Sequence, residues 1–192
     1  MFSTRLYSSL VKVMQQSTPT DGIPFQSATV LRGEVLSFQV SYYTDKQDEI
    51  FSVKAVSKLI DIQIRSVECV PVRSLAWQLD DYALIREPGL MPDLLADLPQ
   101  PFFVPQKLWR TLWITARIPA KTSLSEFDIV LEFKTRENGT VRTEPLNVEV
   151  LLAALPPQKL IHTEWFHTDC LAEYYGVPVF SEEYWYLVET FM

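Results

Sequence analysis

Apolar and polar residues alternate along most of the first 155 positions, and this period constrains the fold more than any other feature. Successive side chains of a β-strand point to opposite faces, so alternation predicts strands with one buried face. The clearest stretches are residues 36–42, 60–65, 112–118, 127–133 and 146–152, with shorter candidates at 10–14 and 50–56. No amphipathic helical repeat lies between them. The pattern therefore predicts a mainly β fold of about seven strands.

The connection between the 127–133 and 146–152 stretches predicts how these two strands pair. Asn138-Gly139 lies between them, and this dipeptide is the preferred two-residue turn of an antiparallel hairpin. The inward apolar stripes supply enough area for a core between two sheets. We therefore predict an immunoglobulin-like antiparallel β-sandwich that ends at Pro156-Pro157.

Residues 70–109 interrupt the alternation. This segment contains the prolines at positions 71, 88, 92, 99, 101 and 105, together with large apolar residues such as Trp77 and Phe102. A linker would be more polar, so we expect a proline-rich but ordered excursion from the sandwich. Long excursions of this kind often carry function.

Residues 158–192 follow a different pattern: an apolar strand, a polar-aromatic turn and then a helix. This order is typical of the opening unit of a (β/α) barrel. The helical stretch reaches Met192 without a Gly, Asn or Pro to end it, so we expect the rest of the barrel to lie beyond that residue. The predicted domains are a β-sandwich at 1–157 and the first strand and helix of an incomplete (β/α) barrel at 158–192.

The turn after the predicted barrel strand holds the first candidate site, formed by Trp165, His167 and Asp169. Aromatic rings stack on the apolar faces of sugars, while imidazole and carboxylate groups bind hydroxyls. Residues at the C-terminal end of a barrel strand face the catalytic side. The alternative is a buried strand end with His167 and Asp169 capping the next helix, which the sequence alone favours because Asp is common at helix N-caps.

A second candidate is the acidic segment Asp80, Asp81 and Tyr82. Paired carboxylates bind cations or act as acid and base, but they also cap helices and form turns. The nucleophile-elbow, P-loop, dinucleotide and H-E-x-x-H motifs are all missing from the sequence, and its histidines and cysteines are too scattered for a zinc site. We therefore predict no catalytic residue, no metal site and no cofactor in this chain.

The charge of the chain limits its partners. A net charge of −7 argues against nucleic acid and against an anionic membrane surface, and it is compatible with a neutral ligand such as a sugar. The first twenty residues lack the apolar segment of a secretory signal, so we expect a cytoplasmic protein. Cys69 and Cys170 are then predicted to be buried thiols, with a disulfide as the alternative.

Five segments of the chain carry a family resemblance: SSLVKV at 8–13, GEVLSFQ at 33–39, DDY at 80–82, PGLMPDLL at 88–95 and WFHTDCLA at 165–172. With these segments the chain resembles bacterial proteins of domain-of-unknown-function family 4091, which is related to glycoside hydrolase family 123. The resemblance implies a β-sandwich before a (β/α) barrel. In the glycosidase relatives the barrel hydrolyses N-acetylgalactosamine glycosides, and an Asp-Glu pair assists the substrate's acetamido group. That pair lies in later barrel strands, so no catalytic residue carries over.

The resemblance predicts a non-catalytic N-terminal module that supports a barrel and contacts carbohydrate through the complete protein. The full-length protein would be a candidate hydrolase of N-acetylhexosaminides. Two alternatives stay open: a stand-alone carbohydrate-binding module, and a structural or dimerisation protein. A single strand–helix unit exposes a strand edge and an apolar helix face, so it either packs on the sandwich or pairs with a second copy. The predicted contacts of such a homo-oligomer are Trp185, Leu187, Val188 and Phe191.

Overall fold

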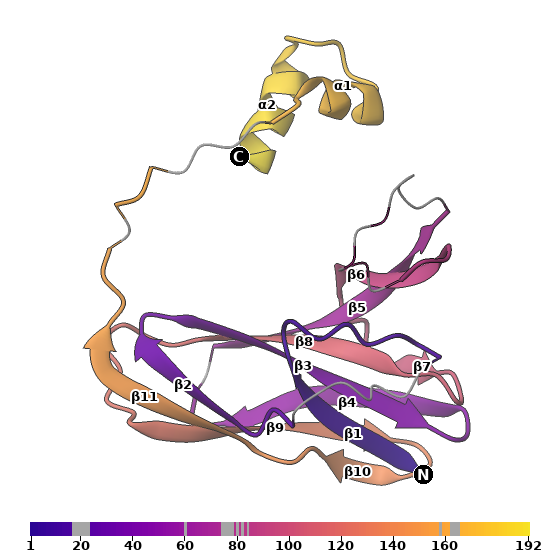
Figure 1. Cartoon of the computed structure of the whole chain (residues 1–192), viewed down its shortest axis with the longest axis vertical. Helices are drawn as coiled ribbons and strands as arrows, with labels where there is room; N and C mark the ends of the chain where they lie inside the picture. Colours follow the sequence, from indigo (N-terminus) through magenta and orange to yellow (C-terminus); the bar gives the residue numbers. More distant parts are fainter. Residues whose placement is uncertain are drawn as a thin grey trace. The chain divides into compact units, whose positions relative to one another are not determined.

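A computed structural model describes residues 1–16, 24–59, 61–73, 79, 81, 83, 85–157, 159–161 and 166–192, and its strands form two sheets. The first sheet has the order β1 (Phe2–Ser8), β3 (Val35–Thr44), β8 (Arg110–Arg117), β5 (Ile62–Val72), β6 (Gly89–Asp97). The second has the order β2 (Ser27–Arg32), β11 (Leu146–Ala154), β9 (Glu126–Thr135), β4 (Asp48–Ser57), β7 (Phe102–Val104), and β10 (Gly139–Arg142) also pairs with β9. Figure 1 shows these two layers, with the β5–β6 hairpin projecting from them.

The chain divides into two compact units, Met1–Leu155 and Pro156–Met192. We call the first the two-sheet unit and the second the helical unit. The strands all belong to the first unit within the described residues, and the two helices belong to the second. The mainly β class that the alternation predicts is therefore confirmed.

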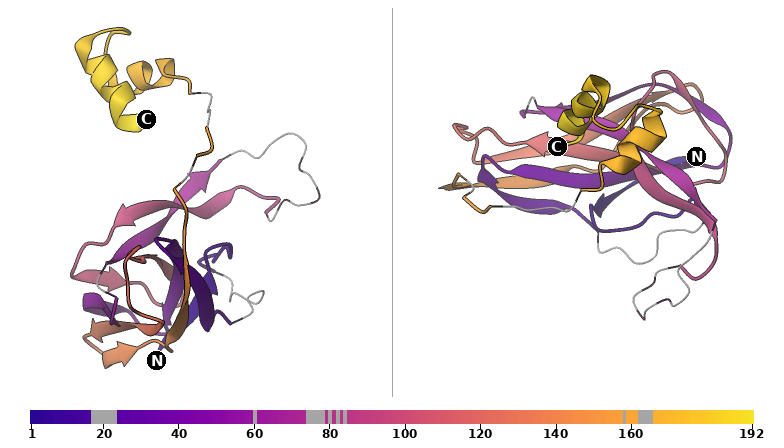
Figure 2. Two further views of the ribbon diagram at one scale, coloured as in Figure 1. Left: turned by 90° about the vertical axis from the view of Figure 1, so that its left-hand side faces the viewer. Right: turned by 90° about the horizontal axis from the view of Figure 1, so that it is seen from above.

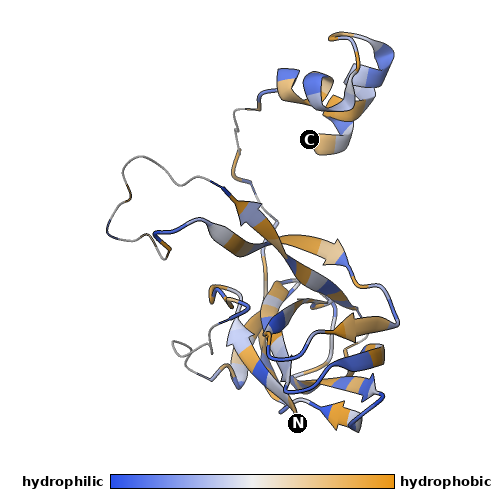
Figure 3. Ribbon diagram, turned by 90° about the vertical axis from the view of Figure 1, so that its right-hand side faces the viewer, coloured by the Kyte–Doolittle hydropathy of each residue, from blue (hydrophilic) through white to orange (hydrophobic). Residues whose placement is uncertain are grey.

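One core lies between the sheets. The inward residues of the predicted alternating strands form it, and its most deeply buried members include Phe38, Val40, Leu112, Ile114, Ile129, Leu131, Phe133, Leu146 and Val148. Figure 3 shows hydrophobic and hydrophilic residues alternating along the strands. Leu152 is the exception, because it is exposed although it continues the apolar stripe of β11. The pairing of β11 with β2 shifts register after Val150, and the residues of β11 beyond that point are all exposed.

The pairing of β2 corrects the prediction of a purely antiparallel sandwich. β2 lies parallel to β11, with Val30 opposite Val150. The strands involved are separated by more than a hundred residues, so no turn signal connects them in the sequence. A parallel pair requires a long connection rather than a hairpin, and this separation provides it.

The prediction of a strand at 10–14 is wrong. The first strand is β1, and residues 9–14 after it form neither strand nor helix. They lie across the outer face of the first sheet, where the Gln39 amide donates hydrogen bonds to the carbonyls of Ser8, Ser9 and Val11. Tyr7, Val13 and Trp109 form a small second core beneath this segment. The alternation at 11–13 therefore belongs to a segment that covers the face of a sheet, not to a strand that pairs within one.

The proline-rich excursion is partly regular, which the sequence does not predict. β5 continues to Val72 and pairs antiparallel with β6, and β7 pairs with β4. β6 does not alternate because it is an edge strand with little buried surface on either face. Pro92 lies in it beside a bulge, a position where an edge strand tolerates proline. Figure 2 shows the β5–β6 hairpin from two further sides.

The hairpin at Asn138-Gly139 forms, but its turn differs from the prediction. Thr135 pairs with Gly139, so a three-residue turn over 136–138 replaces the two-residue turn. Gly139 has φ of +66°, the left-handed conformation that closes such a turn. The buried carboxylate of Asp48 accepts hydrogen bonds from the backbone of Glu137 and from the Asn138 amide, and this contact fixes the longer turn.

The helical unit contains α1 (Asp169–Tyr175) and α2 (Glu182–Phe191). Gly176, with φ of +67°, ends α1, and the Ser181 hydroxyl caps α2 by accepting from the Tyr184 N–H at 3.1 Å. The predicted barrel strand differs from the structure: residues 160, 161 and 166 are not in a strand, and residues 162–165 lie outside the described chain. None of the described residues 159–161 and 166–192 forms a strand.

The predicted oligomer contacts separate into two groups in the helical unit. Val188 is buried with Leu171 and Tyr184, and Leu187 packs against the same cluster. Val188 therefore serves the interior of the unit, which corrects its assignment to an external interface, whereas Leu187 is only half-buried. Trp185 and Phe191 are exposed.

Candidate functional site

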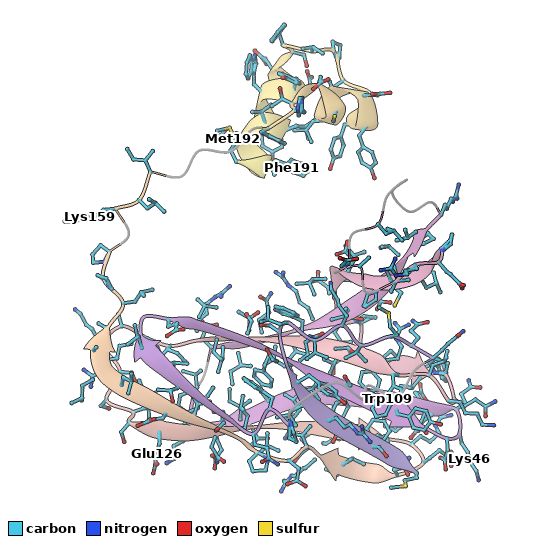
Figure 4. The ribbon with its side chains drawn as sticks, viewed as in Figure 1. Lys46, Trp109, Glu126, Lys159, Phe191 and Met192 are labelled. Atoms are coloured by element: carbon cyan, nitrogen blue, oxygen red, sulfur yellow. The ribbon has the colours of Figure 1, made fainter. Side chains whose placement is uncertain are left out.

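The predicted site before α1 contains two exposed polar side chains. His167 Nδ1 lies 4.0 Å from Asp169 Oδ1, and the two side chains are 81% and 77% exposed. Trp165 lies outside the described residues, so whether it joins them stays a prediction. Figure 4 shows the side chains of this unit, with Phe191 and Met192 labelled at the end of α2.

The capping alternative for this segment is wrong in its details. Thr168, not Asp169, occupies the N-cap of α1, and its side chain does not cap the helix. The Thr168 hydroxyl instead accepts a hydrogen bond from the Tyr184 hydroxyl at 2.5 Å, which ties the start of α1 to α2. Asp169 is the first residue of α1, where a negative charge interacts favourably with the helix dipole. The side chains of His167 and Asp169 are therefore not used as caps.

A shallow hollow of about 430 Å³ lies on the helical unit. Its lining residues are Tyr175, Val177, Glu182, Glu183, Tyr186 and Leu187. Two tyrosine rings beside two carboxylates provide an aromatic surface and hydrogen-bond acceptors. No prediction from the sequence includes this arrangement, although the EEYWY run at 182–186 carries its residues.

The second predicted site is described only in part. Asp80 and Tyr82 lie outside the described residues, and Asp81 is exposed in a turn. Within the part of the chain that the structure describes, no group of three or more His, Cys, Asp or Glu side chains could hold a metal ion. Asp81 therefore has no partner set for cation binding among these residues.

A polar cluster that the sequence analysis missed lies at one end of the first sheet. Arg110 donates to Glu68 at 2.6 Å, and Ser66 also donates to Glu68. Partial burial acts to raise the pKa of Glu68, but the hydrogen bond from Ser66 and the charge of Arg110 outweigh it and lower that pKa. Burial raises the pKa of the neighbouring Tyr42 hydroxyl to about 12. The sequence does indicate this cluster, because Arg110 and Glu68 are charged residues at inward positions of strands, where the alternating pattern otherwise places apolar residues.

The second sheet carries its own ion-pair group on the outer face. Arg142 and Lys54 contact the Glu132 carboxylate at 2.8 Å and 3.0 Å. Hydrogen bonds from Arg142 and Lys54 lower the pKa of Glu132. These contacts join β4, β9 and β10 and leave the carboxylate no proton to donate at neutral pH.

A concavity of about 790 Å³ lies on the same face, between β2, β11, β9 and β4. Glu126, Asp128 and Glu149 contribute carboxylates to it, and Lys58 contributes a cation. Glu126 is labelled in Figure 4. Phe127 is the one aromatic residue in its described lining, and that side chain is buried in the core. The concavity therefore offers no ring on which a sugar could stack.

The cysteines are both free in the structure, and the prediction that both are buried is wrong, because neither is fully buried. Cys69 is half-buried, and burial raises the pKa of its thiol. Cys170 is exposed on α1. The short α1 buries only Leu171 and Ala172, so its other positions, including that of Cys170, face solvent.

Comparison with protein families and with curated proteins gives no match. Solved structures do match. A family 123 glycoside hydrolase from Clostridium perfringens, described for glycolipid glycan hydrolysis, matches with a TM-score of 0.72 at 14% identity. The match covers 98% of this chain and 34% of that one.

Two further structures match with a TM-score of 0.37 each. The sporulation control protein Spo0M from Bacillus subtilis is 9% identical over 77% of this chain and 49% of its own. AvmM, which catalyses macrocyclization in alchivemycin A biosynthesis, is 12% identical over 83% of this chain and 92% of its own. Neither of these two TM-scores indicates a shared fold. The first match shows that this chain has the fold of about a third of the Clostridium perfringens hydrolase.

Proposed function

We propose that this chain is a non-catalytic N-terminal module of a glycoside-hydrolase-like protein, and that it supports a (β/α) barrel. Residues 1–157 would be an immunoglobulin-like β-sandwich, and residues 158–192 the first unit of the barrel. The observation that carries the proposal is the fold match to a family 123 hydrolase over nearly all of this chain but only a third of that enzyme. The resemblance of five sequence segments to family 4091 points in the same direction.

The contacts of three strand carboxylates support a non-catalytic role. Most glycosidases need two carboxyl groups that flank a cleft and exchange protons with the substrate. Glu132 is held by two cations, Glu68 by Arg110 and Ser66, and Asp48 by backbone and amide donors. Each of these carboxylates stabilises the strands around it and is not free to act as an acid.

The proposal assigns sugar contacts to Trp165, His167 and Asp169 once a barrel is present. The exposure of His167 and Asp169 supports this role, because both side chains are available at the start of α1. A spacing of 4.0 Å between their polar atoms allows one sugar hydroxyl to bond to both. We propose a cytoplasmic bacterial protein with carbohydrate, rather than nucleic acid or a membrane, as its ligand.

A structural role through α2 is the second candidate function. Trp185 and Phe191 are exposed, as are Phe180 and Tyr186. Aromatic side chains gathered on a small unit are typical of a surface that another body covers. Neither described helix is long and apolar enough to span a membrane.

Hydrolysis by the chain itself provides the test of the non-catalytic role. We expect no release of 4-nitrophenol from 4-nitrophenyl N-acetyl-β-galactosaminide, with an active N-acetylgalactosaminidase as the positive control. Release that scales with the concentration of the chain, and that the substitution Asp169→Asn abolishes, would contradict the proposal and place catalysis within these residues.

A further inference from the structure

The outer face of the first sheet carries a second candidate ligand site, centred on Trp113. Trp113 lies on β8, with Gln39 of β3 beside it on one side and Arg65 of β5 on the other. The next row of the same face contains Thr111, Val67 and Leu95. Trp113 is half-buried, so part of its ring stays open to solvent.

Two walls turn this face into a groove of about 220 Å³, which we call the Trp113 groove. The segment after β1 forms one wall with Ser9, Val11 and Lys12, and β6 forms the other with Pro92, Asp93 and Leu95. The Lys12 ammonium group donates to the Pro92 carbonyl at 3.4 Å and thereby connects the walls. Three segments that are far apart in the sequence therefore meet around one aromatic ring.

The walls of the groove are held in place before any ligand arrives. Gln39 is only 5% exposed, and its Nε2 group donates to the carbonyls of Ser8, Ser9 and Val11 at 3.0, 3.3 and 2.7 Å. On the opposite side, the register of β5 and β6 shifts between Glu68 and Cys69, so Asp93 has no cross-strand partner. Such bulges re-aim a side chain. A preorganised site loses less entropy on binding than a mobile one.

The chemistry of the groove combines one aromatic ring with both donors and acceptors. Lys12 donates, Ser9 does both, and Asp93 accepts. The amide oxygen of Gln39, which also lines the groove, is a further acceptor. Sugars present apolar C–H faces to aromatic rings and hydroxyls to such groups.

We infer that the Trp113 groove binds one residue of a neutral saccharide. The opposite charges of Lys12 and Asp93 balance within the groove, and the chain carries a net charge of −7, so an anion is disfavoured. The polar walls disfavour a purely apolar ligand. The inference extends the proposed function by adding a saccharide site on the sandwich, but it requires no barrel. Failure of the groove to bind would leave the supporting role intact.

Isothermal titration of the whole chain with N-acetylgalactosamine, galactose and inorganic phosphate tests the inference. We expect saturable binding of at least one of the two saccharides and none of phosphate. The substitution Trp113→Ala should weaken that binding about tenfold or more, through loss of the stacking surface. Trp185→Ala, which removes an exposed tryptophan from the helical unit, is the matched control and should leave the affinity unchanged.

The exposed Asp93 supplies a second variant in case Trp113→Ala does not fold. Asp93→Ala should keep the strand signal in circular dichroism and weaken saccharide binding several-fold. Absence of saccharide binding would overturn the inference, as would binding that both variants leave unchanged. Phosphate binding alone, strengthened by Asp93→Ala, would assign the groove to anions and would also overturn it.

Discussion

Replacing Phe133 by alanine is expected to lower the free energy of unfolding by about 3–5 kcal/mol. Phe133 has no exposed surface and lies in β9, in the middle of the second sheet. Its ring centroid is 5.4 Å from that of Phe2 and 5.7 Å from that of Tyr42, both on the first sheet. The substitution leaves a cavity where the two sheets meet. Urea denaturation followed by far-ultraviolet circular dichroism measures the change.

The control for this prediction is Phe103→Ala. Phe103 is the same residue type, but it is 65% exposed and lies on the short edge strand β7. Its removal should change the free energy of unfolding by less than about 0.5 kcal/mol. Equal effects of the two substitutions would contradict a core shared by the two sheets.

Replacing Asp48 by alanine is expected to cost about 1–3 kcal/mol, because hydrogen-bond donors near the core lose their acceptor. Asp48 is only 3% exposed. Its Oδ1 accepts from the backbone of Glu49 at 2.8 Å and of Glu137 at 3.1 Å, and its Oδ2 accepts from the Asn138 amide at 2.9 Å. The same denaturation experiment gives the size of the loss.

The rate of amide hydrogen exchange reports locally on the hydrogen bonds of Asp48. The amide of Glu137 should exchange faster in Asp48→Ala, because that N–H loses its acceptor. Asp97→Ala on the edge strand β6 is the matched control, since Asp97 is exposed. Unchanged exchange at Glu137 together with unchanged stability would contradict the role of Asp48 in holding the turn.

The core could be predicted because it depends on local pattern alone. A strand turns every second side chain inward, so the alternation over 127–133 identifies Phe127, Ile129, Leu131 and Phe133 as core residues before any pairing is known. The Asn138-Gly139 signal identified the hairpin for the same reason. Its turn length was wrong because Asp48, about ninety residues away, contributes the contacts that hold it.

The features that the sequence did not reveal depend on contacts between distant segments. β2 pairs with β11, and β6 pairs with β5. Residues 9–14 lie over a sheet, where the Gln39 amide donates hydrogen bonds to their backbone. No local period encodes these pairings. A polar Gln39 in the outward stripe looked like an exposed residue, and only the backbone carbonyls above it explain its burial.

The same contrast between local pattern and long-range contact applies to the candidate sites. His167 and Asp169 are two residues apart, so their proximity could be expected from the sequence. The Trp113 groove needs Lys12, Trp113 and Asp93 from three separate segments, so the sequence shows Trp113 only as an outward aromatic residue. Two of these segments, at 8–13 and 88–95, are among those that carry the family resemblance, but the resemblance does not indicate that they meet.

The intact mass of the natural gene product, isolated from its own host with an antibody against this chain, tests the central claim most directly. The mass of the present sequence is 22.2 kDa. A module that supports a barrel predicts a polypeptide more than twice as heavy that hydrolyses an N-acetylhexosaminide. A natural product of 22.2 kDa without such activity would contradict the account and favour a stand-alone binding or structural protein.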